Sequence, residues 1–472
     1  MEFVRAKRSL ATLGIFLGDK KNTLGCKDIP RKSKHFRDPI HGMIEVDPKA
    51  RYIIDSQLFQ RLRGIKQLAF THLVYHGAEH SRFGHSLGVY HLARTLTDHL
   101  KVDDSSVADA FCLAALLHDV GHFPFSHAFE SVARSYDKDL KHEKYTEKLI
   151  QHSEISDRLL EVGVDSKHVV EFLRGRYLRD PDFVFLNGLL DAELDIDRLD
   201  FLLRDSHYCG VTYGTYDLDR LILSMKPYRN QEVIITKKGL HSVEIYVLAR
   251  FNMYLQVYAH HTRRAFDLML KSLFPKEQFE SLGYPKPTKD EIHEIVDFDD
   301  NWLLGKIKAA AKTNGNTHCS SLATQFMKRD PIRCVCECLA FTDVLEPGKR
   351  AMPAYTTISN LSSMSARKEM ADSFNLPIEE IWVDKPMEDL PFENRYRPFS
   401  YRGESEKGII RILSSADEEP RDIAEVPSSL ASFLARNMVQ MARIYTTQEH
   451  RVMFRDHLKK RYSDFEDIMW LP

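Results

Sequence analysis

The stretch "LLHDVGHFPFSH" at residues 116–127 places three histidines and one aspartate behind an apolar run. His118 and Asp119 are adjacent near the end of a segment with helical periodicity, which Gly121 and Pro124 should stop or bend. Neighbouring residues of a helix point about 100° apart, so both side chains can approach one ion only where the chain bends or faces a pocket. The stretch is therefore interpreted either as part of a metal site or as a polar helix end.

Further donors lie elsewhere in the chain. "SRFGHSLG" supplies His85 at the start of a predicted helix, and "ELDIDRLDFLLRD" (193–205) supplies four aspartates on another. Two imidazoles and two carboxylates suit a borderline divalent ion such as Fe, Mn, Zn or Ni, whereas Mg prefers oxygen donors. A lone histidine or aspartate more often caps a helix or fills a core. The joint pattern H…HD…D with two further histidines favours a metal site.

The composition is that of an ordinary globular protein. The chain has 472 residues, 43% hydrophobic and 28% charged, with a formal net charge of -2, so no global field attracts nucleic acid or an acidic membrane. No apolar run is long enough to span a membrane. Seven cysteines in no regular framework indicate a reducing, cytoplasmic location. "CVCEC" (334–338) is interpreted as a half-buried strand with its thiols on one face, in preference to a metal motif.

The chain divides into three parts by texture. Residues 1–33 are expected to form an N-terminal extension, 34–275 a mainly helical core, and 276–472 a smaller α+β lobe. Within the core, "EVIITKKGLHSVEIYV" (232–247) has two β-branched runs that predict a hairpin around "KKGL". Residues 250–274 read as one long helix.

Six blocks give the chain a family resemblance. They are "KHFRDPIHGMIEVD", "IIDSQLFQRLRGIKQL", "SRFGHSLGVYHLA", "HDVGHFPFSHAFE", "KHEKYTEKLI" and "DIDRLDFLLRD". Over about residues 34–265 they resemble, in order and spacing, the dNTP triphosphohydrolases of the HD phosphohydrolase superfamily. The resemblance implies a mainly α fold, with an HD-domain helical core, a small β-hairpin and an α+β C-terminal lobe. It also implies hydrolysis of a dNTP to a deoxynucleoside and inorganic triphosphate.

The same resemblance implies the metal and catalytic residues. The metal ligands would be His85, His118, Asp119 and Asp197, with Asp195 as the rival for the last place. They would bind a divalent ion (Mn, Fe, Mg, Zn or Ni) whose identity the sequence does not fix. The catalytic histidines would be His122 and His142, with His122 as the proton donor. Glu130 stands where the family has an aspartate and is expected to orient His122.

The substrate-binding residues that the resemblance implies are Gln67, Leu68, Arg82, His127, Arg198, Phe201, Asp205, Arg250 and Tyr258. Arg82 and His127 would hold phosphates and Arg250 the γ-phosphate. Arg198 replaces a family lysine, which keeps the charge and adds a fork of donors.

The sugar contacts follow in the same way. Gln67 and Asp205 would meet the 3′-hydroxyl, while Leu68 and Tyr258 would crowd the 2′ position and exclude ribonucleotides. Phe201 replaces a family tyrosine, so one hydroxyl is lost near the phosphates or the sugar.

A second set resembles a site where relatives bind an activating nucleotide and assemble as tetramers. It comprises Lys34, Asp55, Gln60 and Arg63. Asp55 could accept hydrogen bonds from a guanine, and the lysine and arginine would hold phosphates. The resemblance thus implies a GTP or dNTP activator and a homotetramer.

Two alternatives stay open. The chain could be another HD-type nucleotide phosphohydrolase or phosphodiesterase, or a non-enzymatic protein that binds nucleotides or, weakly, single-stranded nucleic acid. Intact His122 and His142 argue against a pure binding role. An assay with each dNTP would separate the three functions by their products.

Overall fold

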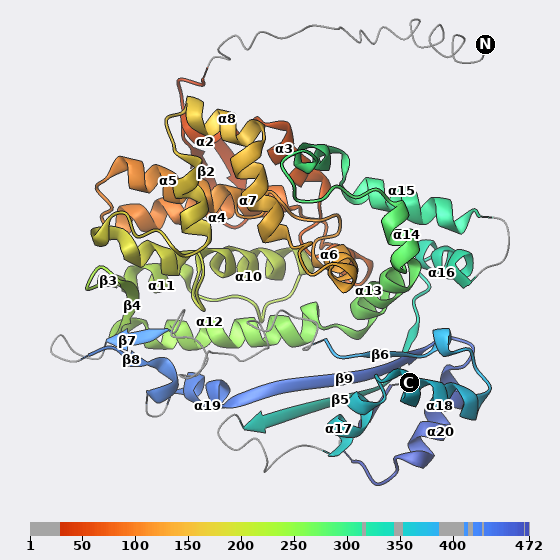
Figure 1. Cartoon of the computed structure of the whole chain (residues 1–472). Coiled ribbons are helices and arrows are strands. Elements are labelled where there is room, and N and C mark those ends of the chain that lie inside the picture. Colours follow the sequence, from red (N-terminus) through yellow and green to blue (C-terminus); the bar gives the residue numbers. More distant parts are fainter. Residues whose placement is uncertain are drawn as a thin grey trace, which may run out of the picture.

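The computed structural model describes residues 29–313, 318–343, 353–386, 410–413, 419–426, 429–466 and 468–471. Helices form the larger part of the molecule, and strands of the C-terminal lobe lie below them in the view of Figure 1. The predicted mainly α fold with small sheets is confirmed. Most of the expected N-terminal extension, residues 1–33, lies outside the described residues.

An N-terminal hairpin precedes the helices. Strand β1 (Lys34–Asp38) pairs antiparallel with β2 (Gly42–Val46). The helices that follow, up to residue 275, are α2 (Pro48–Ile54), α3 (Gln57–Gln60), α4 (Arg82–His99), α5 (Ser105–Leu117), α6 (His127–Tyr136), α7 (His142–His152), α8 (Glu154–Glu161), α9 (Ser166–Leu173), α10 (Ile196–Cys209), α11 (Leu218–Ser224), α12 (Leu240–Met253) and α13 (His261–Leu273).

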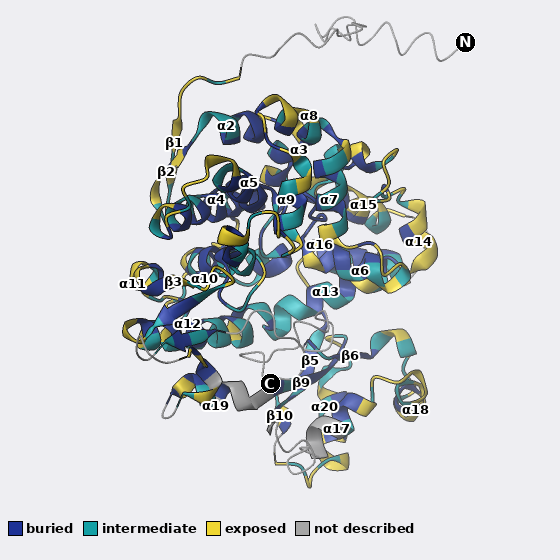
Figure 2. Cartoon of the chain, turned by 60° about the vertical axis from the view of Figure 1, so that its left-hand side comes forward, coloured by how far each residue is buried: buried dark blue, intermediate teal, exposed yellow. Residues whose placement is uncertain are grey.

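Helix α5 is the centre of this part. Asp104 caps it by accepting from the backbone N–H groups of Ser106 and Val107. From Ala110 to Leu117 the helix is apolar on every side, and a helix of this kind is stable only when neighbours surround it. Helices α4 and α9 pack against it, and Figure 2 shows the buried residues gathered along α4 and α5. The HD motif at its C-terminal end therefore stands on a rigid support.

The second predicted hairpin is displaced. The structure pairs β3 (Met225–Tyr228) with β4 (Glu232–Thr236), so the hairpin does not lie around "KKGL". Its turn uses positive φ at Arg229 and Asn230, as tight hairpin turns require. The second β-branched run instead forms α12, because Val243, Tyr246 and Val247 follow a helical spacing and are buried.

The predicted single helix over 250–274 is wrong. Helix α12 ends in a π turn at Tyr254–Tyr258, and α13 starts afresh at His261. The buried guanidinium of Arg443 donates to the carbonyl of Ala259 in the break. The interruption turns Tyr258 toward Asp205, which it contacts at 2.7 Å.

Beyond residue 275 helices and strands alternate. The helices are α14 (Lys276–Ser281), α15 (Asp300–Ala311), α16 (His318–Met327), α17 (Pro353–Asn360), α18 (Met364–Phe374), α19 (Leu430–Arg436) and α20 (Arg451–Arg461). The strands are β5 (Arg333–Asp343), β6 (Trp382–Asp384), β7 (Arg411–Leu413), β8 (Arg421–Asp422), β9 (Asn437–Thr446) and β10 (Ile468–Trp470). Phe279, Leu303 and Phe326 share the large buried cluster of the helical core. The domain boundary after residue 275 stays a prediction.

Two four-stranded sheets complete the lobe. One has the order β10-β5-β9-β6, and the other joins the core hairpin to the C-terminal part in the order β3-β4-β7-β8. The strand predicted at "CVCEC" is β5, and its three cysteines are buried. A bulge between Cys334 and Cys336 interrupts the alternation expected there.

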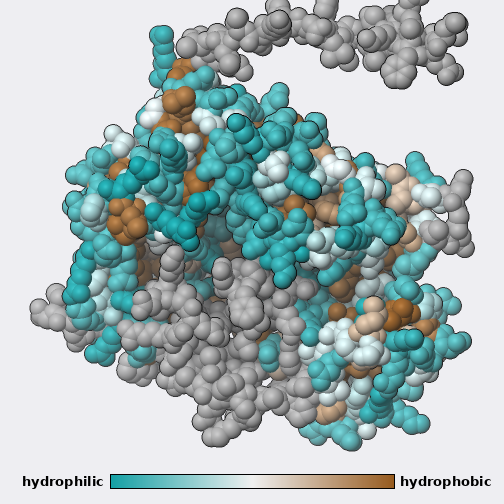
Figure 3. Space-filling model, viewed as in Figure 1, coloured by the Kyte–Doolittle hydropathy of each residue, from teal (hydrophilic) through white to brown (hydrophobic). Residues whose placement is uncertain are grey.

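Hydrophilic side chains cover most of the described face in Figure 3. Among the described residues, none of the helices combines the length and the apolarity needed to cross a membrane.

Candidate metal centre and catalytic cavity

Three helices bring the four predicted metal ligands together. His85 comes from α4, His118 and Asp119 from the end of α5, and Asp197 from the first turn of α10. The Nε2 atom of His85 lies 2.9 Å from Asp197 Oδ1 and 3.2 Å from His118 Nε2. The carboxylate of Asp119 lies 3.4 Å from His118 Nε2 and 3.7 Å from His85 Nε2.

The hydrogen bonds made by the Nδ1 atoms of His85 and His118 determine which nitrogen of each ring carries the proton. His118 Nδ1 lies 2.8 Å from the carbonyl oxygen of Ala115, which can only accept, so Nδ1 carries the proton. His85 Nδ1 likewise donates to Asp200 Oδ2 at 2.8 Å. In the neutral rings both Nε2 atoms are therefore lone pairs aimed at carboxylate oxygens. Lone pairs crowded in this way need a cation among them.

The spacing also fits a metal ion. Nitrogen and oxygen donors about 2.1 Å from a common ion lie roughly 3.0–3.4 Å from one another, for octahedral to tetrahedral angles. His85, His118 and Asp197 form a group whose donor atoms fall within 4.8 Å. Burial opposes a charged His85, but Asp197 and Asp200 raise the pKa of His85 to about 10. A bound cation would take the place of that proton.

Asp195 is the poorer candidate for the fourth ligand. It is the N-cap of α10, where it accepts from the Arg198 N–H at 2.8 Å, and it also forms an ion pair with the Arg198 guanidinium. These contacts hold its carboxylate at the helix end. The geometry therefore supports Asp197.

A tight turn carries the chain from the candidate metal ligands to the predicted catalytic residues. A Cβ on Gly121 would lie 2.2 Å from the backbone nitrogen of Thr146 on α7, so only glycine permits this approach. Phe125 and Ser126 both adopt positive φ, a strained conformation for residues with side chains. The backbone N–H of Phe125 donates to buried Asp300 at 2.6 Å, which helps to hold the turn.

The two predicted catalytic histidines stack beside the candidate metal ligands. The rings of His122 and His142 lie 4.1 Å apart and nearly parallel. Glu130 contacts His142 Nδ1 at 3.0 Å and His127 Nδ1 at 2.9 Å. The expectation that Glu130 orients His122 is therefore not met, because its carboxylate faces the other two histidines. His122 Nδ1 is buried and has no hydrogen-bond partner among the described residues.

The surroundings shift the pKa values of His122 and His142 in opposite directions. Burial and the nearby Arg82 and His142 lower the pKa of His122 well below its ordinary value, so its ring is neutral. Burial opposes the charged form of His142 as well, but Glu130 raises its pKa to about 9. At neutral pH His142 therefore carries a proton that it can give away, whereas His122 does not. His142 is therefore the ring of the two that can donate a proton at neutral pH.

A cavity of about 920 Å³ opens beside these groups. Its size lies within the range of pockets that enclose small ligands. The cavity brings together all nine predicted substrate residues, which are Gln67, Leu68, Arg82, His127, Arg198, Phe201, Asp205, Arg250 and Tyr258.

The three arginines predicted to hold phosphates are paired with acids. Arg82 contacts Asp119, and Arg250 forms a half-buried ion pair with Glu193. Arg198 is held by Asp195 at the N-terminal cap of α10. An anionic ligand that uses these arginines must therefore take the place of the carboxylates.

The predicted sugar-binding residues form a second polar group. Asp205 is buried and accepts from Tyr258 at 2.7 Å and from His80 Nε2 at 2.8 Å. The Oε1 atom of buried Gln67 has no hydrogen-bond partner among the described residues. These oxygens are available to a hydroxyl group of a ligand.

None of the predicted activator residues is among the residues that line this cavity. Gln60 accepts from Arg63 at 2.8 Å, and the Arg63 guanidinium lies 3.5 Å from the centre of the Phe83 ring. Lys34 is on strand β1, and Asp55 is the C-cap of α2. Nucleotide binding by these four residues stays a prediction.

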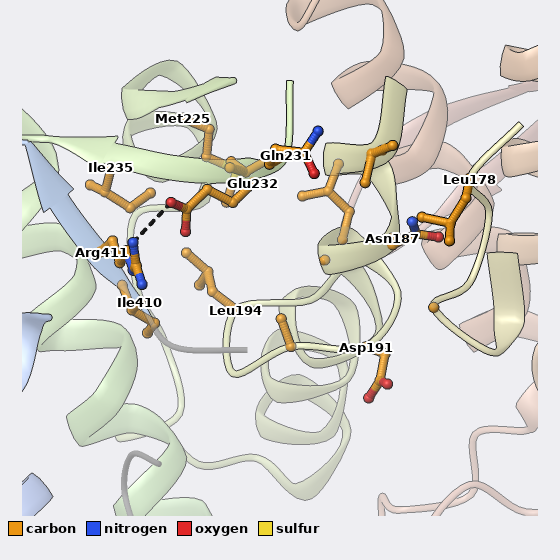
Figure 4. A pocket seen from close by; sticks show the side chains of 16 residues that line it. Leu178, Asn187, Asp191, Leu194, Met225, Gln231, Glu232, Ile235, Ile410 and Arg411 are labelled. Carbon is orange, nitrogen blue, oxygen red and sulfur yellow. Dashed lines mark hydrogen bonds and ion pairs between the residues drawn. The ribbon is translucent and has the colours of Figure 1, made fainter. Parts of the chain in front are cut away.

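A smaller cavity of about 280 Å³ lies beside the β3–β4 hairpin (Figure 4). Leu178, Leu194 and Ile410 contribute apolar walls, and the ion pair between Glu232 and Arg411 spans one side at 3.1 Å. It contains none of the predicted site residues.

Sequence reasoning assigned no chemical role to four residues around the centre. They are His41, His80, Glu193 and Asp200. Asp200 follows Asp197 by three positions on α10, a spacing that puts both on neighbouring parts of one helix surface and could have indicated it. No local pattern distinguishes His41 or His80 from other histidines, because only the fold brings them to their carboxylate partners.

Comparisons with known proteins agree with this geometry. Residues 82–198 match the HD domain family, and residues 216–394 match the HD associated region. Residues 82–198 thus carry an HD domain, as the sequence motifs predicted, and the associated region follows it.

Curated relatives match over part of their length. An uncharacterized protein of Bacillus subtilis, YwfO, is 39% identical over 262 residues, which cover 54% of this chain and 58% of that protein. The deoxynucleoside triphosphate triphosphohydrolase SAMHD1 homolog of Dictyostelium discoideum is 31% identical over 294 residues, or 59% of this chain and 56% of that protein. The deoxynucleoside triphosphate triphosphohydrolase SAMHD1 of Gallus gallus is 32% identical over 279 residues, which cover 52% of this chain and 45% of that protein. The matched region spans about half the length of these relatives.

Solved structures share the fold over most of the chain. A hypothetical protein from Aquifex aeolicus is 26% identical with a TM-score of 0.69, covering 90% of this chain and all of that one. A phosphohydrolase from Bacteroides thetaiotaomicron is 24% identical with a TM-score of 0.67, covering 88% and 100%. The second likeness is one of fold alone.

Proposed function

We propose that this HD-domain protein is a metal-dependent dNTP triphosphohydrolase, which converts a dNTP and water into a deoxynucleoside and inorganic triphosphate. The observation that carries the proposal is the convergence, beside one cavity, of a two-imidazole, two-carboxylate donor set and a charged His142. Curated relatives named as dNTP triphosphohydrolases give independent support for the substrate class.

A divalent ion would be held by His85, His118, Asp119 and Asp197, and when bound it would offset negative charge on the phosphate oxygens. The metal could be Mn, Fe, Mg, Zn or Ni, although the two imidazoles make Mg the least favoured. The protein contributes a rigid donor set whose imidazole tautomers are fixed in advance.

The proton needed for bond cleavage comes from His142. Water attacks the α-phosphorus, the bond from phosphorus to the nucleoside 5′-oxygen breaks, and that oxygen takes a proton. His142 is protonated at neutral pH and lines the cavity, so it can supply this proton from Nε2 while Nδ1 stays on Glu130. Neutral His122 beside it can accept a hydrogen bond from the attacking water.

The residues that line the cavity offer contacts for both a triphosphate and a deoxyribose. Arg82, Arg198 and Arg250 would hold the phosphate chain, with His127 at the mouth, where its side chain is 64% exposed. Asp205 and Gln67 would bind the 3′-hydroxyl, and Leu68 and Tyr258 would leave no room for a 2′-hydroxyl. Phe201 offers only an apolar surface there.

We also propose that Lys34, Asp55, Gln60 and Arg63 bind an activating GTP or dNTP at a subunit interface of a homotetramer. The contact between Gln60 and Arg63 supports a joint role for these two. Light scattering with and without GTP tests the assembly, and a monomer under both conditions would contradict it. We place the protein in the cytoplasm, because the described cysteines form no disulfide with one another.

The deciding experiment incubates the purified protein with Mn²⁺ and each dNTP and separates the products by chromatography. Release of deoxynucleoside and triphosphate supports the proposal. A nucleoside monophosphate as product would indicate another HD-type phosphohydrolase. Absence of turnover with every dNTP, with and without GTP or dATP, would favour a binding protein. His122→Ala should keep the metal and lose turnover, and loss of metal in that variant would contradict its assigned role.

A further inference from the structure

Asp200 lies directly behind the metal ligand His85. Its side chain is completely buried and accepts four hydrogen bonds. His85 Nδ1 and Arg204 Nε contact Oδ2 at 2.8 and 2.7 Å, while His41 Nε2 and Arg204 Nη2 contact Oδ1 at 2.7 and 2.8 Å. Each oxygen of this carboxylate therefore accepts two hydrogen bonds, which uses both of its lone pairs.

The N-terminal hairpin closes the network from the far side. Asp38, the last residue of β1, accepts hydrogen bonds from Arg204 on both carboxylate oxygens, at 2.7 and 3.2 Å. Asp38 Oδ1 also accepts the backbone N–H of His41 at 3.0 Å, which sets the turn that carries the His41 ring inward. The hairpin thus reaches the back of His85 through two buried links.

The helices are shaped to admit this network. A Cβ on Gly88 of α4 would lie 1.8 Å from Asp200 Oδ1 and 2.5 Å from an Arg204 nitrogen. The glycine therefore leaves the space that the carboxylate and guanidinium occupy. Burying so many charged groups is costly unless each is paired, and here each one is. Asp38, His41, Asp200 and Arg204 all fall outside the two segments that match the family, 82–198 and 216–394.

We propose that Asp200 is the positioning residue of the metal centre, and that His41 and Arg204 hold it in place. Asp200 keeps the proton of His85 on Nδ1, so that the Nε2 lone pair always faces the metal. The hairpin formed by β1 and β2 is then part of the metal centre, although it supplies no ligand. This inference rests on the metal centre of the proposed function and not on the identity of the substrate.

Metal affinity of the full-length protein tests the proposal without any substrate. Mn²⁺ binding is measured by calorimetry on wild type and on Asp200→Asn, after circular dichroism has shown that each is folded. An amide can donate to His85 and allows the ring to place its lone pair on Nδ1, so we expect affinity to fall about 10- to 100-fold. Co²⁺ absorption reports the ligands directly, and the d–d bands of the variant should change.

Asp384→Asn is the matched control. Asp384 is also fully buried and forms a two-bond pair with an arginine, Arg264, at 2.7 and 3.1 Å, but it touches no metal ligand. Its loss should lower stability without changing Mn²⁺ affinity or the Co²⁺ spectrum. An equal loss of metal affinity in both variants would show a general structural effect and overturn the proposal.

His41→Gln covers the case in which Asp200→Asn does not fold. It replaces the rigid ring that donates to Asp200 with a flexible amide and leaves the charged partners of Arg204 in place, and we expect a loss of about 3- to 10-fold in Mn²⁺ affinity. A folded Asp200→Asn or His41→Gln protein with wild-type affinity would overturn the inference. A wild type that binds no divalent ion would overturn it together with the metal centre. Weakened metal binding in a protein that hydrolyses no dNTP would leave the inference standing while the proposed function fails.

Discussion

Replacing Glu130 with glutamine isolates the electrostatic role of one carboxylate. Glu130 accepts from the His142 ring at 3.0 and 3.1 Å and from the His142 backbone N–H at 3.0 Å. Glutamine has nearly the same shape and keeps one oxygen for these contacts. It removes the negative charge that keeps the His142 ring protonated.

The size of the effect follows from the pKa of His142. Glu130 raises that pKa to about 9 against the opposing effect of burial, so its loss should return the pKa to the ordinary value of about 6.5 or below. At pH 8 the protonated fraction of His142 would fall from about 0.9 to about 0.03, a loss of about 30-fold. At pH 6 the loss would be less than about 2-fold.

The assay is the pH profile of kcat/KM for a dNTP between pH 5.5 and 9.5, with Mn²⁺ saturation checked at each pH. A protonated donor is lost as pH rises through its pKa, so the wild-type rate should decline near pH 9 and the variant rate near pH 6.5 or lower. Glu143→Gln is the matched control, because Glu143 lies 3.5 Å from the same ring nitrogen but is 62% exposed. Its charge is screened by solvent, and the profile should barely move.

Two results would refute the reasoning. An unchanged alkaline limb in Glu130→Gln would show that His142 is not the group that titrates. An equal loss of activity at every pH would show that Glu130 acts through geometry alone.

Three further predictions concern the donor set, the turn and the phosphate site. His118→Ala should abolish both Mn²⁺ uptake in calorimetry and dNTP turnover, and tight Mn²⁺ binding in this variant would show a wrong donor set. Gly121→Ala puts a Cβ 2.2 Å from Thr146 N, so we expect about 2 kcal/mol less unfolding free energy in urea and a large drop in kcat, which unchanged stability would contradict. Glu193→Gln frees Arg250 from a competing carboxylate and should lower KM for dNTPs about 3- to 10-fold, whereas a raised KM would show that Glu193 helps binding.

Local sequence patterns predicted the elements that bear the metal ligands. The apolar periodicity before His118 predicted a buried helix, and the carboxylate-rich stretch around Asp197 predicted another. Patterns of this kind act within a few turns of chain, so reading them needs no knowledge of distant contacts. The misplaced hairpin at 232–247 shows the limit, because β-branched residues form a helix where that helix buries them.

Which side chains become hydrogen-bond partners depends on tertiary contacts that the spacing of residues in the sequence does not reveal. Glu130 was expected to serve His122, yet a turn strained at Phe125 and Ser126 aims it at His142 and His127. The one-methylene difference from the family's aspartate gave no indication of this choice. The choice of His142 as the proposed proton donor therefore followed only from the burial and charge around each ring.

The sequence by itself determined the kinds of donor and their order along the chain, and with them the HD fold and a metal site. The tertiary structure decided what each donor does. It placed Asp200 behind His85, brought His41 from a distant hairpin, and separated the pKa values of His122 and His142. The physical reason is that side-chain chemistry belongs to a residue, whereas tautomer and charge state depend on neighbours that only the fold supplies.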